Sequence, residues 1–421
     1  MKKVDRSVRV LSKKATAMQR NASLCIVAAS ALTSVVNAAE WPFFRGPEYT
    51  GASQESSWNP KFSDPRIAWK AEVGTGAASF TVMGNRVLTS GNKDDKDTIW
   101  CFDLDSGKVL WKDTFPCKFE KRMFEGGTAS TPTIDGDRVY NLSYDGQLRC
   151  LNLADGSLVW KAHLIDDFGG NLSTWKYAGS PLVQGKLVIV DCGGNGNSTL
   201  ALDKSTGKKV WGSGNQNAGY ASPIPMNLKG EAAVLVFKGK SMVAQRVSDG
   251  KQLWEVEWET SYDVNASSPV PLPNEQIVIT SGYGGGRAAL YDLSGSSPKE
   301  LWRNDDIKTK MSSAVVHGDG VFAVSGDNSG KLICVSLKTG KTLWTEGGFG
   351  FGTLTLAGDK LVILGESGNL VIAEATTSGY KPISEAVILK RKCWVNPVLV
   401  NGRVLAKNNK GDTVCVDLSK E

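Results

Sequence analysis

The sequence predicts an all-β fold, an eight-bladed β-propeller made of four-stranded antiparallel blades. One hairpin pattern recurs along most of the 421 residues: an apolar strand, a glycine turn and a short strand that ends on tryptophan. Successive copies of this tryptophan are 42–51 residues apart, and four strands in a repeat of about 40–50 residues are typical of propellers. The last copy stops one strand short, and an unpaired strand near the N-terminus completes it.

Residues 1–38 are predicted to be a secretory signal peptide. Seven basic residues accompany the apolar run 22–36, and small residues follow at Asn37-Ala38-Ala39, as at a signal cleavage site. The run is shorter than the ~20 apolar residues of a membrane span. We therefore expect a periplasmic or secreted protein with no transmembrane segment in the mature chain.

The formal charge of +6 comes from this N-terminal segment. Without its seven bases and one acid, the chain has 42 basic and 42 acidic residues. No basic excess remains to neutralise phosphates, so the composition argues against nucleic-acid binding.

Residues 39–65 form a lead-in rich in aromatic residues, glycine and proline, without periodicity. Leaving so many rings in water is costly, so we expect the lead-in to pack against the domain. The propeller itself is predicted to span residues 66–421 as one domain. Its first element, residues 66–73, looks like an outer strand that lacks a preceding hairpin.

The hairpin is clearest in Leu332–Trp344 (LICVSLKTGKTLW). Alternating apolar residues around a glycine turn predict a β-hairpin, and glycine suits a turn position with positive φ. The repeated tryptophans are expected to be packing residues wedged between blades, each burying on the order of 150–250 Å². They are Trp69, Trp111, Trp160, Trp211, Trp254, Trp302 and Trp344.

Two strands are expected before each hairpin. The first begins near a small residue followed by proline, as at Ser180-Pro181 and Ser222-Pro223. Proline is confined to sheet edges, which fits an innermost strand lining a central channel. The seventh repeat, Phe351–Leu389, lacks the tryptophan, and we expect Val387 or Leu389 in its place. The eighth repeat begins at Trp394 and takes its outer strand from residues 66–73.

Seven cysteines follow the predicted signal peptide. Cys101, Cys150, Cys334 and Cys415 share one repeat position, at which other copies have alanine. We expect these four to be small buried side chains. The remaining three fall in or near loops, where disulfide pairing stays open: Cys117, Cys192 and Cys393.

The pattern of small residue, Asp, Thr-Gly-Lys and Trp in Ala201–Trp211 resembles the pyrroloquinoline-quinone (PQQ) propeller repeat, over about residues 66–421. The lead-in motif Trp41-Pro42…Arg45-Gly46-Pro47 is similar to the opening of bacterial exported PQQ-like propeller proteins. The resemblance implies one of two functions. Quinoprotein dehydrogenases hold PQQ and calcium, whereas proteins of the barrel-assembly factor B (BamB) type use a cofactor-free ring to bind proteins.

The residues favour the second function. Quinoprotein enzymes of this family have two adjacent cysteines, and this sequence has no such pair. Acids that are candidates for calcium ligands, Asp263, Asp327 and Glu366, match no motif of the family. His163 and His317 lie in different repeats, which argues against a zinc site or a triad. We expect no catalytic, cofactor-binding or metal-binding residues, with a PQQ- and calcium-dependent alcohol or sugar dehydrogenase as the alternative.

The long loops between blades are the predicted binding face. They combine aromatic rings with arginine, the residue types enriched at binding hot spots, although such rings also serve to pin loops. The candidates are Phe119, Arg122, Phe124, Phe168, Trp175, Trp258, Tyr262, Tyr283 and Arg287. We therefore expect a monomeric, non-catalytic scaffold for envelope proteins, with recognition of a small ligand or glycan at the channel mouth as a further hypothesis.

Overall fold

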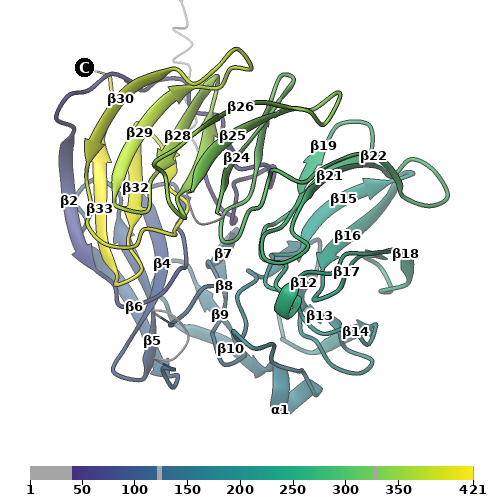
Figure 1. The fold of residues 1–421 in the computed structure, drawn as a ribbon. Helices are drawn as coiled ribbons and strands as arrows, with labels where there is room; N and C mark the ends of the chain where they lie inside the picture. The colour runs from purple at the N-terminus through teal and green to yellow at the C-terminus, as the bar shows by residue number, and fades with distance from the viewer. Residues whose placement is uncertain (1–39, 121–125, 327–329, 421) are drawn as a thin grey trace, which may run out of the picture. The chain divides into compact units, whose positions relative to one another are not determined.

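The computed structural model describes residues 40–120, 126–326 and 330–420. The chain divides into two units, residues 1–37 and residues 38–421, and the predicted signal peptide lies outside the described residues. In the second unit the strands form eight antiparallel blades that follow one another around a ring (Figure 1). The predicted eight-bladed propeller is confirmed.

Each of the first four blades is a continuous run of four strands, given from the innermost strand outward. Blade 1 contains β3 (Thr81–Met83), β4 (Arg86–Lys93), β5 (Lys96–Asp103) and β6 (Val109–Pro116). Blade 2 contains β7 (Thr133–Asp135), β8 (Arg138–Leu142), β9 (Gln147–Asn152) and β10 (Leu158–His163). Blade 3 contains β11 (Leu182–Gln184), β12 (Leu187–Asp191), β13 (Thr199–Asp203) and β14 (Lys209–Ser213). Blade 4 contains β15 (Ile224–Leu228), β16 (Glu231–Phe237), β17 (Ser241–Arg246) and β18 (Gln252–Glu257).

Blades 5 to 7 repeat this arrangement, and blade 8 draws on both ends of the domain. Blade 5 contains β19 (Val270–Leu272), β20 (Gln276–Thr280), β21 (Ala288–Asp292) and β22 (Lys299–Asn304). Blade 6 contains β23 (Val315–His317), β24 (Gly320–Ser325), β25 (Lys331–Ser336) and β26 (Thr342–Glu346). Blade 7 contains β27 (Thr353–Ala357), β28 (Lys360–Leu364), β29 (Asn369–Glu374) and β30 (Pro382–Val387). Blade 8 contains β31 (Val398–Val400), β32 (Arg403–Lys407), β33 (Asp412–Asp417) and β2 (Arg66–Glu72).

The ring is closed by β2, as the sequence predicts. β2 pairs antiparallel with β33, and Trp69 lies opposite Cys415. Trp160 lies opposite Cys150 in the same way, although those two residues belong to one continuous hairpin. The N-terminal strand thus removes the open edge that β33 would otherwise present.

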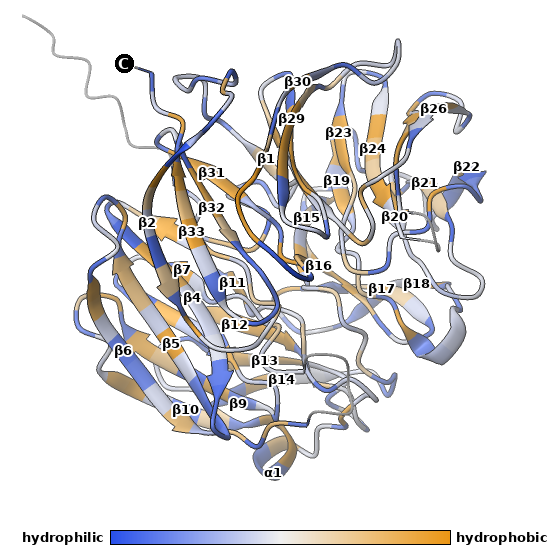
Figure 2. Ribbon diagram, turned by 60° about the vertical axis from the view of Figure 1, so that its left-hand side comes forward, coloured by the Kyte–Doolittle hydropathy of each residue, from blue (hydrophilic) through white to orange (hydrophobic). Residues whose placement is uncertain are grey.

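The hydrophobic core lies between neighbouring blades. The second and third strands are almost fully buried, whereas the outer strands are largely exposed on one face. Figure 2 shows apolar residues, in orange, along the strands of the blades. One cluster joins Tyr140 and Cys150 of blade 2 to Val188 and Leu200 of blade 3. Such clusters between blades hold the ring together.

The outer-strand tryptophans extend from each blade to the next one. Six indole N–H groups donate to a backbone carbonyl beside the next blade's hairpin turn, at 2.6–3.0 Å. The pairs are Trp69 with Leu104, Trp111 with Leu153, Trp160 with Lys204, Trp211 with Val247, Trp302 with Leu337, and Trp344 with Thr376. Trp254 differs, since its indole nitrogen has no hydrogen-bond partner among the described residues.

The turn glycines are required for two reasons. Gly107 has a φ of 68°, as the hairpin geometry demands. A Cβ at this position would also lie 2.6 Å from the ring of Trp69. Gly156, Gly207, Gly250 and Gly340 contact tryptophans of the preceding blades in the same way.

The prediction of Val387 or Leu389 as the tryptophan substitute in blade 7 is wrong in register, although Leu389 is buried in the core between blades 7 and 8. The strand register puts Ser384 opposite Ile372, the position that tryptophan takes in the other blades, and Val387 is 73% exposed. Blade 8 has no hairpin turn against which a tryptophan of blade 7 would pack, because its outer strand comes from the N-terminus. Trp58 of the lead-in lies there instead, in the cluster between blades 7 and 8.

The lead-in crosses the ring at the end where the first and second strands of the blades turn. The Pro42 carbonyl accepts a hydrogen bond from Ile134 of blade 2, and the buried guanidinium of Arg45 donates to Ala314, which precedes blade 6. The short strand β1 (Ala52–Ser53) then pairs parallel with β27 of blade 7. One segment therefore contacts blades on several sides of the channel.

The seven cysteines of the described residues are all free and buried. The register confirms that Cys101, Cys150, Cys334 and Cys415 each lie opposite a blade tryptophan. The open question of pairing among the other three is answered, because none of them forms a disulfide. Burial raises the pKa of the Cys192 and Cys393 thiols to about 12.

Candidate binding site at the channel mouth

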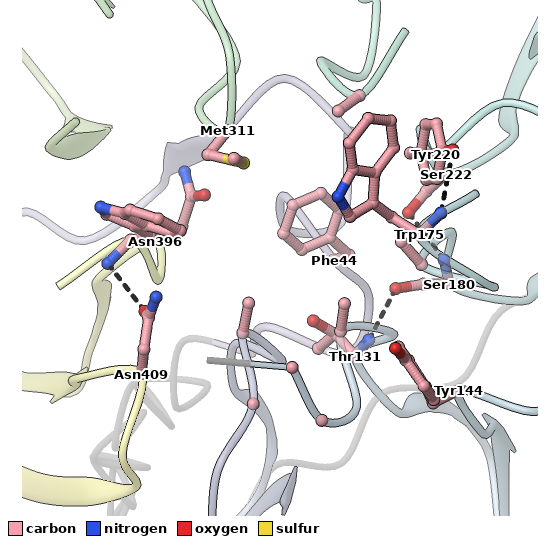
Figure 3. A pocket seen from close by; sticks show the side chains of 18 of the residues that line it. Phe44, Thr131, Tyr144, Trp175, Ser180, Tyr220, Ser222, Met311, Asn396 and Asn409 are labelled. Carbon is pink, nitrogen blue, oxygen red and sulfur yellow. Dashed lines mark hydrogen bonds between the residues drawn. The ribbon is translucent and has the colours of Figure 1, made fainter. Parts of the chain in front are cut away.

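A cavity of about 190 Å³ occupies the centre of the ring (Figure 3). The ring of Phe44 enters it from the lead-in, and the remaining lining residues belong to loops at the opposite end of the channel and to the approaches of the inner strands. Its larger or polar side chains are Phe44, Thr131, Tyr144, Trp175, Ser180, Tyr220, Ser222, Tyr283, Met311, Trp394, Asn396 and Asn409. We call this cavity, with Phe44 of the lead-in in its lining, the cup.

Aromatic rings from three loops meet at this mouth. Trp175 lies edge-on to Tyr220, with 6.0 Å between ring centroids, and edge-on to Tyr262 at 6.1 Å. The backbone N–H of Trp175 also donates to the Tyr220 hydroxyl at 3.2 Å. Burial raises the pKa of Tyr220 and Tyr283, so both keep a phenol proton that can be donated.

The loops that carry these rings have an unusual backbone. Lys176, Tyr262, Asp263 and Tyr283 all have φ between 58° and 67°. Residues other than glycine rarely adopt this region, at a cost of about 1–3 kcal/mol each, and they do so where the surroundings fix them. Tyr262 is also exposed over 75% of its surface.

A belt of hydroxyl groups surrounds the channel below the aromatic rings. The N–H groups of Ser79, Thr131, Ser180, Ser222 and Ser268 each donate to the hydroxyl of the next blade, ending at Ser313, at 2.8–3.2 Å. These hydroxyl residues belong to the short approaches to the inner strands, and four of them, Thr131, Ser180, Ser222 and Ser268, stand directly before a proline. The belt both joins six blades and presents hydroxyl groups to the cavity.

The structure brings together part of the predicted face. Trp175 and Tyr283 line the cavity and Tyr262 contacts Trp175 at its rim. Sequence reasoning missed Phe44, Tyr144, Tyr220 and Trp394, which also line it. The sequence offered one signal for Tyr220. It stands two residues before Ser222-Pro223, a step that marks the approach to an inner strand.

Trp258 does not belong to an accessible face, which corrects the prediction for this residue. Its side chain is fully buried and its indole N–H donates to Ser281 Oγ at 2.8 Å. The guanidinium of Arg287 lies 4.0 Å from the Trp258 ring and donates to the Gly285 carbonyl. The pair pins its two loops together.

The other predicted face residues lie away from the cavity lining or outside the described chain. Phe168 ends the single-turn helix α1 (Leu164–Phe168) and packs on the core between blades 2 and 3. The N–H of Phe119 donates to Asp95 at 2.8 Å. Arg122 and Phe124 lie outside the described residues.

The acids considered as calcium ligands do not form a site in the described chain. Both carboxylate oxygens of Glu366 accept hydrogen bonds, from the Trp394 indole and from the Phe351 N–H. Asp263 belongs to the short 3-10 helix η1 (Ser261–Asp263) in another loop, and Asp327 lies outside the described residues. His163 caps α1 by accepting from the Asp166 N–H.

The cavity does not fit PQQ with calcium. PQQ is a tricarboxylate and needs cationic partners, and calcium needs several oxygen ligands with negative charge among them. Every described residue lining the cavity is uncharged. The uncharged side chains of the lining therefore suit a neutral ligand.

The chain matches the family model described as "Outer membrane protein assembly factor BamB" over residues 61–167 and 122–346. Together these matches cover more than half of the sequence. The chain belongs to this family. In the described part of this BamB-family chain, no helix is long and apolar enough to cross a membrane.

Curated relatives in this family are distant in sequence. The BamB of Shewanella oneidensis is 24% identical over 308 residues, which cover 71% of this chain and 66% of that protein. The BamB of Escherichia coli K12 is 23% identical over 296 residues, covering 67% of this chain and 70% of that protein. The alignments thus span about two thirds of the relatives' lengths.

Solved structures of two functional classes share the fold. BamB from Moraxella catarrhalis has a TM-score of 0.63 at 15% identity, covering 85% of this chain and 99% of that one. Quinohemoprotein alcohol dehydrogenase from Comamonas testosteroni has a TM-score of 0.66 at 14% identity, covering 92% of this chain and 82% of that one. At such identities the likeness shows the fold alone, since one fold hosts unrelated functions.

Proposed function

We propose that this BamB-family protein is a non-catalytic scaffold of the bacterial cell envelope, exported to the periplasm, that binds other envelope proteins during outer-membrane protein assembly. The family match over residues 61–346 carries this proposal, and the curated relatives bear that function in their name. The quinoprotein alternative is weaker, because the cavity lacks the charged groups that PQQ and calcium require.

The rim of the channel mouth is the surface we assign to the partner. Tyr262 projects from a strained loop and its ring contacts Trp175. A large aromatic side chain that is exposed and held rigid loses little conformational entropy on binding, and tyrosine and tryptophan are enriched at hot spots. Tyr262 and Trp175 are therefore expected to dominate the contact.

A deletion and complementation experiment tests the proposal. Deleting the gene in its host should lower the amount of folded β-barrel protein in the outer membrane, and the wild-type gene should restore it. The variant Trp175→Ala/Tyr262→Ala should be exported and folded but should restore it poorly. Val387→Ala is the matched control, because Val387 is equally exposed but lies on the outer strand β30.

Two results would contradict the proposal. An unchanged level of folded barrel proteins after deletion would remove the assembly role itself. Full restoration by the double variant, with the assembly role intact, would instead reject the rim as the contact surface. A third measurement addresses the alternative function: dye reduction with an alcohol or sugar by protein supplied with PQQ and calcium would make it an enzyme.

A further inference from the structure

We propose that the cavity is a binding site for the terminal unit of a neutral carbohydrate. The proposal concerns the interior of the cup, whereas the scaffold function concerns its rim. It does not rest on the proposed function, because it is tested with the purified protein alone.

The size of the cavity limits what enters it. Its volume of about 190 Å³ is smaller than the ~300–1,000 Å³ of sites that enclose a whole drug-sized ligand. The ring of Phe44 takes up part of the lining (Figure 3). The site therefore accepts one ring-sized group at the end of a longer molecule.

The walls suit the faces of a sugar ring. Trp175 and Tyr220 form one side of the mouth, and Asn396 and Asn409 stand across the cavity from them (Figure 3). Aromatic faces offer apolar surface with a negative quadrupole to the weakly positive C–H groups of a ring. The amides opposite can fix the orientation of its hydroxyl groups.

Several polar side chains that line the cavity have unused hydrogen-bond donors. The hydroxyl oxygens of Thr131, Ser180 and Ser222 each accept a backbone N–H, and none of these hydroxyls donates to an acceptor among the described residues. Asn409 lines the cavity and its Oδ1 accepts from the Trp394 N–H at 3.2 Å, while its Nδ2 donates to no acceptor in the described chain. These donors line the cavity, so a ligand rich in oxygen acceptors can pair with them.

The charge pattern separates a neutral sugar from other occupants. No described residue of the lining is itself charged. Two cations near the lining, Lys310 and Lys392, lie 5.2 Å and 5.1 Å from the ring centroids of Tyr283 and Trp394, where the aromatic rings already contact them. The lining itself therefore supplies no cation for a phosphate, carboxylate or sulfate and no anion for an amine. A purely apolar side chain of a peptide would leave the hydroxyl and amide donors unmatched. A sugar ring carries no charge, has oxygen acceptors for these donors and is small enough for the cavity.

The test is isothermal titration of the purified mature chain with neutral trisaccharides of glucose, galactose, mannose and N-acetylglucosamine. A neutral hexapeptide with aromatic ends and an oligogalacturonate serve as comparison ligands. We expect at least one neutral trisaccharide to bind, and the oligogalacturonate and the peptide not to bind. Titrations that show no neutral trisaccharide bound, or the peptide bound in its place, would overturn the proposal.

Variants locate the binding in the cavity. Ala178→Leu adds volume inside the cavity without removing a hydrogen bond, and Trp175→Ala removes one wall; each should weaken binding at least tenfold. Ala232→Leu is the matched control, because Ala232 lies exposed on β16 and should leave affinity unchanged. Should Ala178→Leu fold poorly, Ala266→Leu on another part of the lining replaces it. Undiminished affinity in the folded cavity variants would also overturn the proposal.

Discussion

Two buried lysines occupy comparable positions at the ends of second strands, in blades 4 and 8, but differ in their partners. Lys238 Nζ lies 2.6 Å from Asp191 Oδ1 and also donates to the Ser198 carbonyl. Lys407 Nζ instead donates to the Ser90 carbonyl at 3.0 Å and to Thr89 Oγ1 at 3.3 Å. Burial lowers the pKa of Lys407 to about 7, whereas Asp191 opposes the same effect of burial on Lys238.

Lys407 should make stability depend on pH. Its pKa is about 7 in the folded chain against 10.5 when exposed, so the unfolded chain binds more protons between these values and stability rises with pH. This contribution is complete above pH 10.5 and is lost as the pH falls through 7. We expect Lys407→Met to raise the free energy of unfolding, most strongly below pH 7, and to flatten its rise from pH 7 to pH 10 in denaturant titrations.

Lys238→Met is the control for this prediction and should act in the opposite direction. Removing Lys238 leaves Asp191 buried without a counter-charge, which costs about 3–5 kcal/mol. Changes of opposite sign for the two lysines would support the distinction between a paired and an unpaired buried charge. A Lys407→Met protein less stable than wild type at pH 6 would contradict it.

The blade tryptophans offer a second test at the scale of one residue. Trp211 is buried against the turn of blade 4 and its indole N–H is bonded to the Val247 carbonyl. We expect Trp211→Ala to lower the free energy of unfolding by about 3–5 kcal/mol. Trp254→Ala should cost less, because Trp254 is less buried and its indole nitrogen is without a described partner. Similar losses for both, measured by chemical denaturation, would count against the role of the turn contact.

At the scale of elements, turns between strands require glycine for two different reasons. Gly84 and Gly107 both have positive φ, at 55° and 68°. A Cβ at Gly84 would meet nothing within 4 Å, whereas one at Gly107 would collide with Trp69. The two positions therefore separate backbone strain from interblade packing.

Substituting both glycines with alanine measures that difference. Gly84→Ala should cost about 1–2 kcal/mol, the penalty for an L-residue in the left-handed region. Gly107→Ala should cost about 1–3 kcal/mol more, because the added methyl displaces Trp69. Thermal unfolding in parallel provides the measurement, and equal destabilisation would mean that the tryptophan moves aside freely.

The sequence pattern predicts elements well where each carries its own signal. Alternating strands, positive-φ glycines and the β2–β33 pairing all follow from local patterns and from counting. The pattern fails at blade 7, where Ser384 occupies the tryptophan position. Periodicity favoured the nearest apolar residues, but Trp58 fills the space from more than 300 residues away, and no local pattern carries such a contact.

For the whole molecule, the candidate site was only half predictable for the same reason. The long loops identified Trp175, Tyr262 and Tyr283, because unexplained aromatic residues in loops stand out. Tyr220 lies next to a strand and Phe44 in the lead-in, and both enter the cavity only because the ring closes around a common axis. Which aromatic side chains point into the channel is decided only when the propeller closes.

Ring closure itself leads to a prediction for the whole molecule. A chain beginning at residue 74 lacks β2 and the lead-in, so β33 becomes an open edge that can pair with another chain. We expect this truncated protein to melt at a lower temperature and to self-associate in sedimentation experiments. A chain beginning at residue 40 should remain monomeric and stable, and a monomeric, equally stable protein from residue 74 would contradict the prediction.

The seven buried thiols have a consequence for how the protein is made. Since no pair of them is joined in the described chain, maturation of the fold requires no electron acceptor and no disulfide exchange. The chain should reach the same structure whether it is produced in a reducing or an oxidising compartment. Each thiol also remains unreactive as long as the ring is closed, so alkylation of cysteine reports directly on opening of the blades.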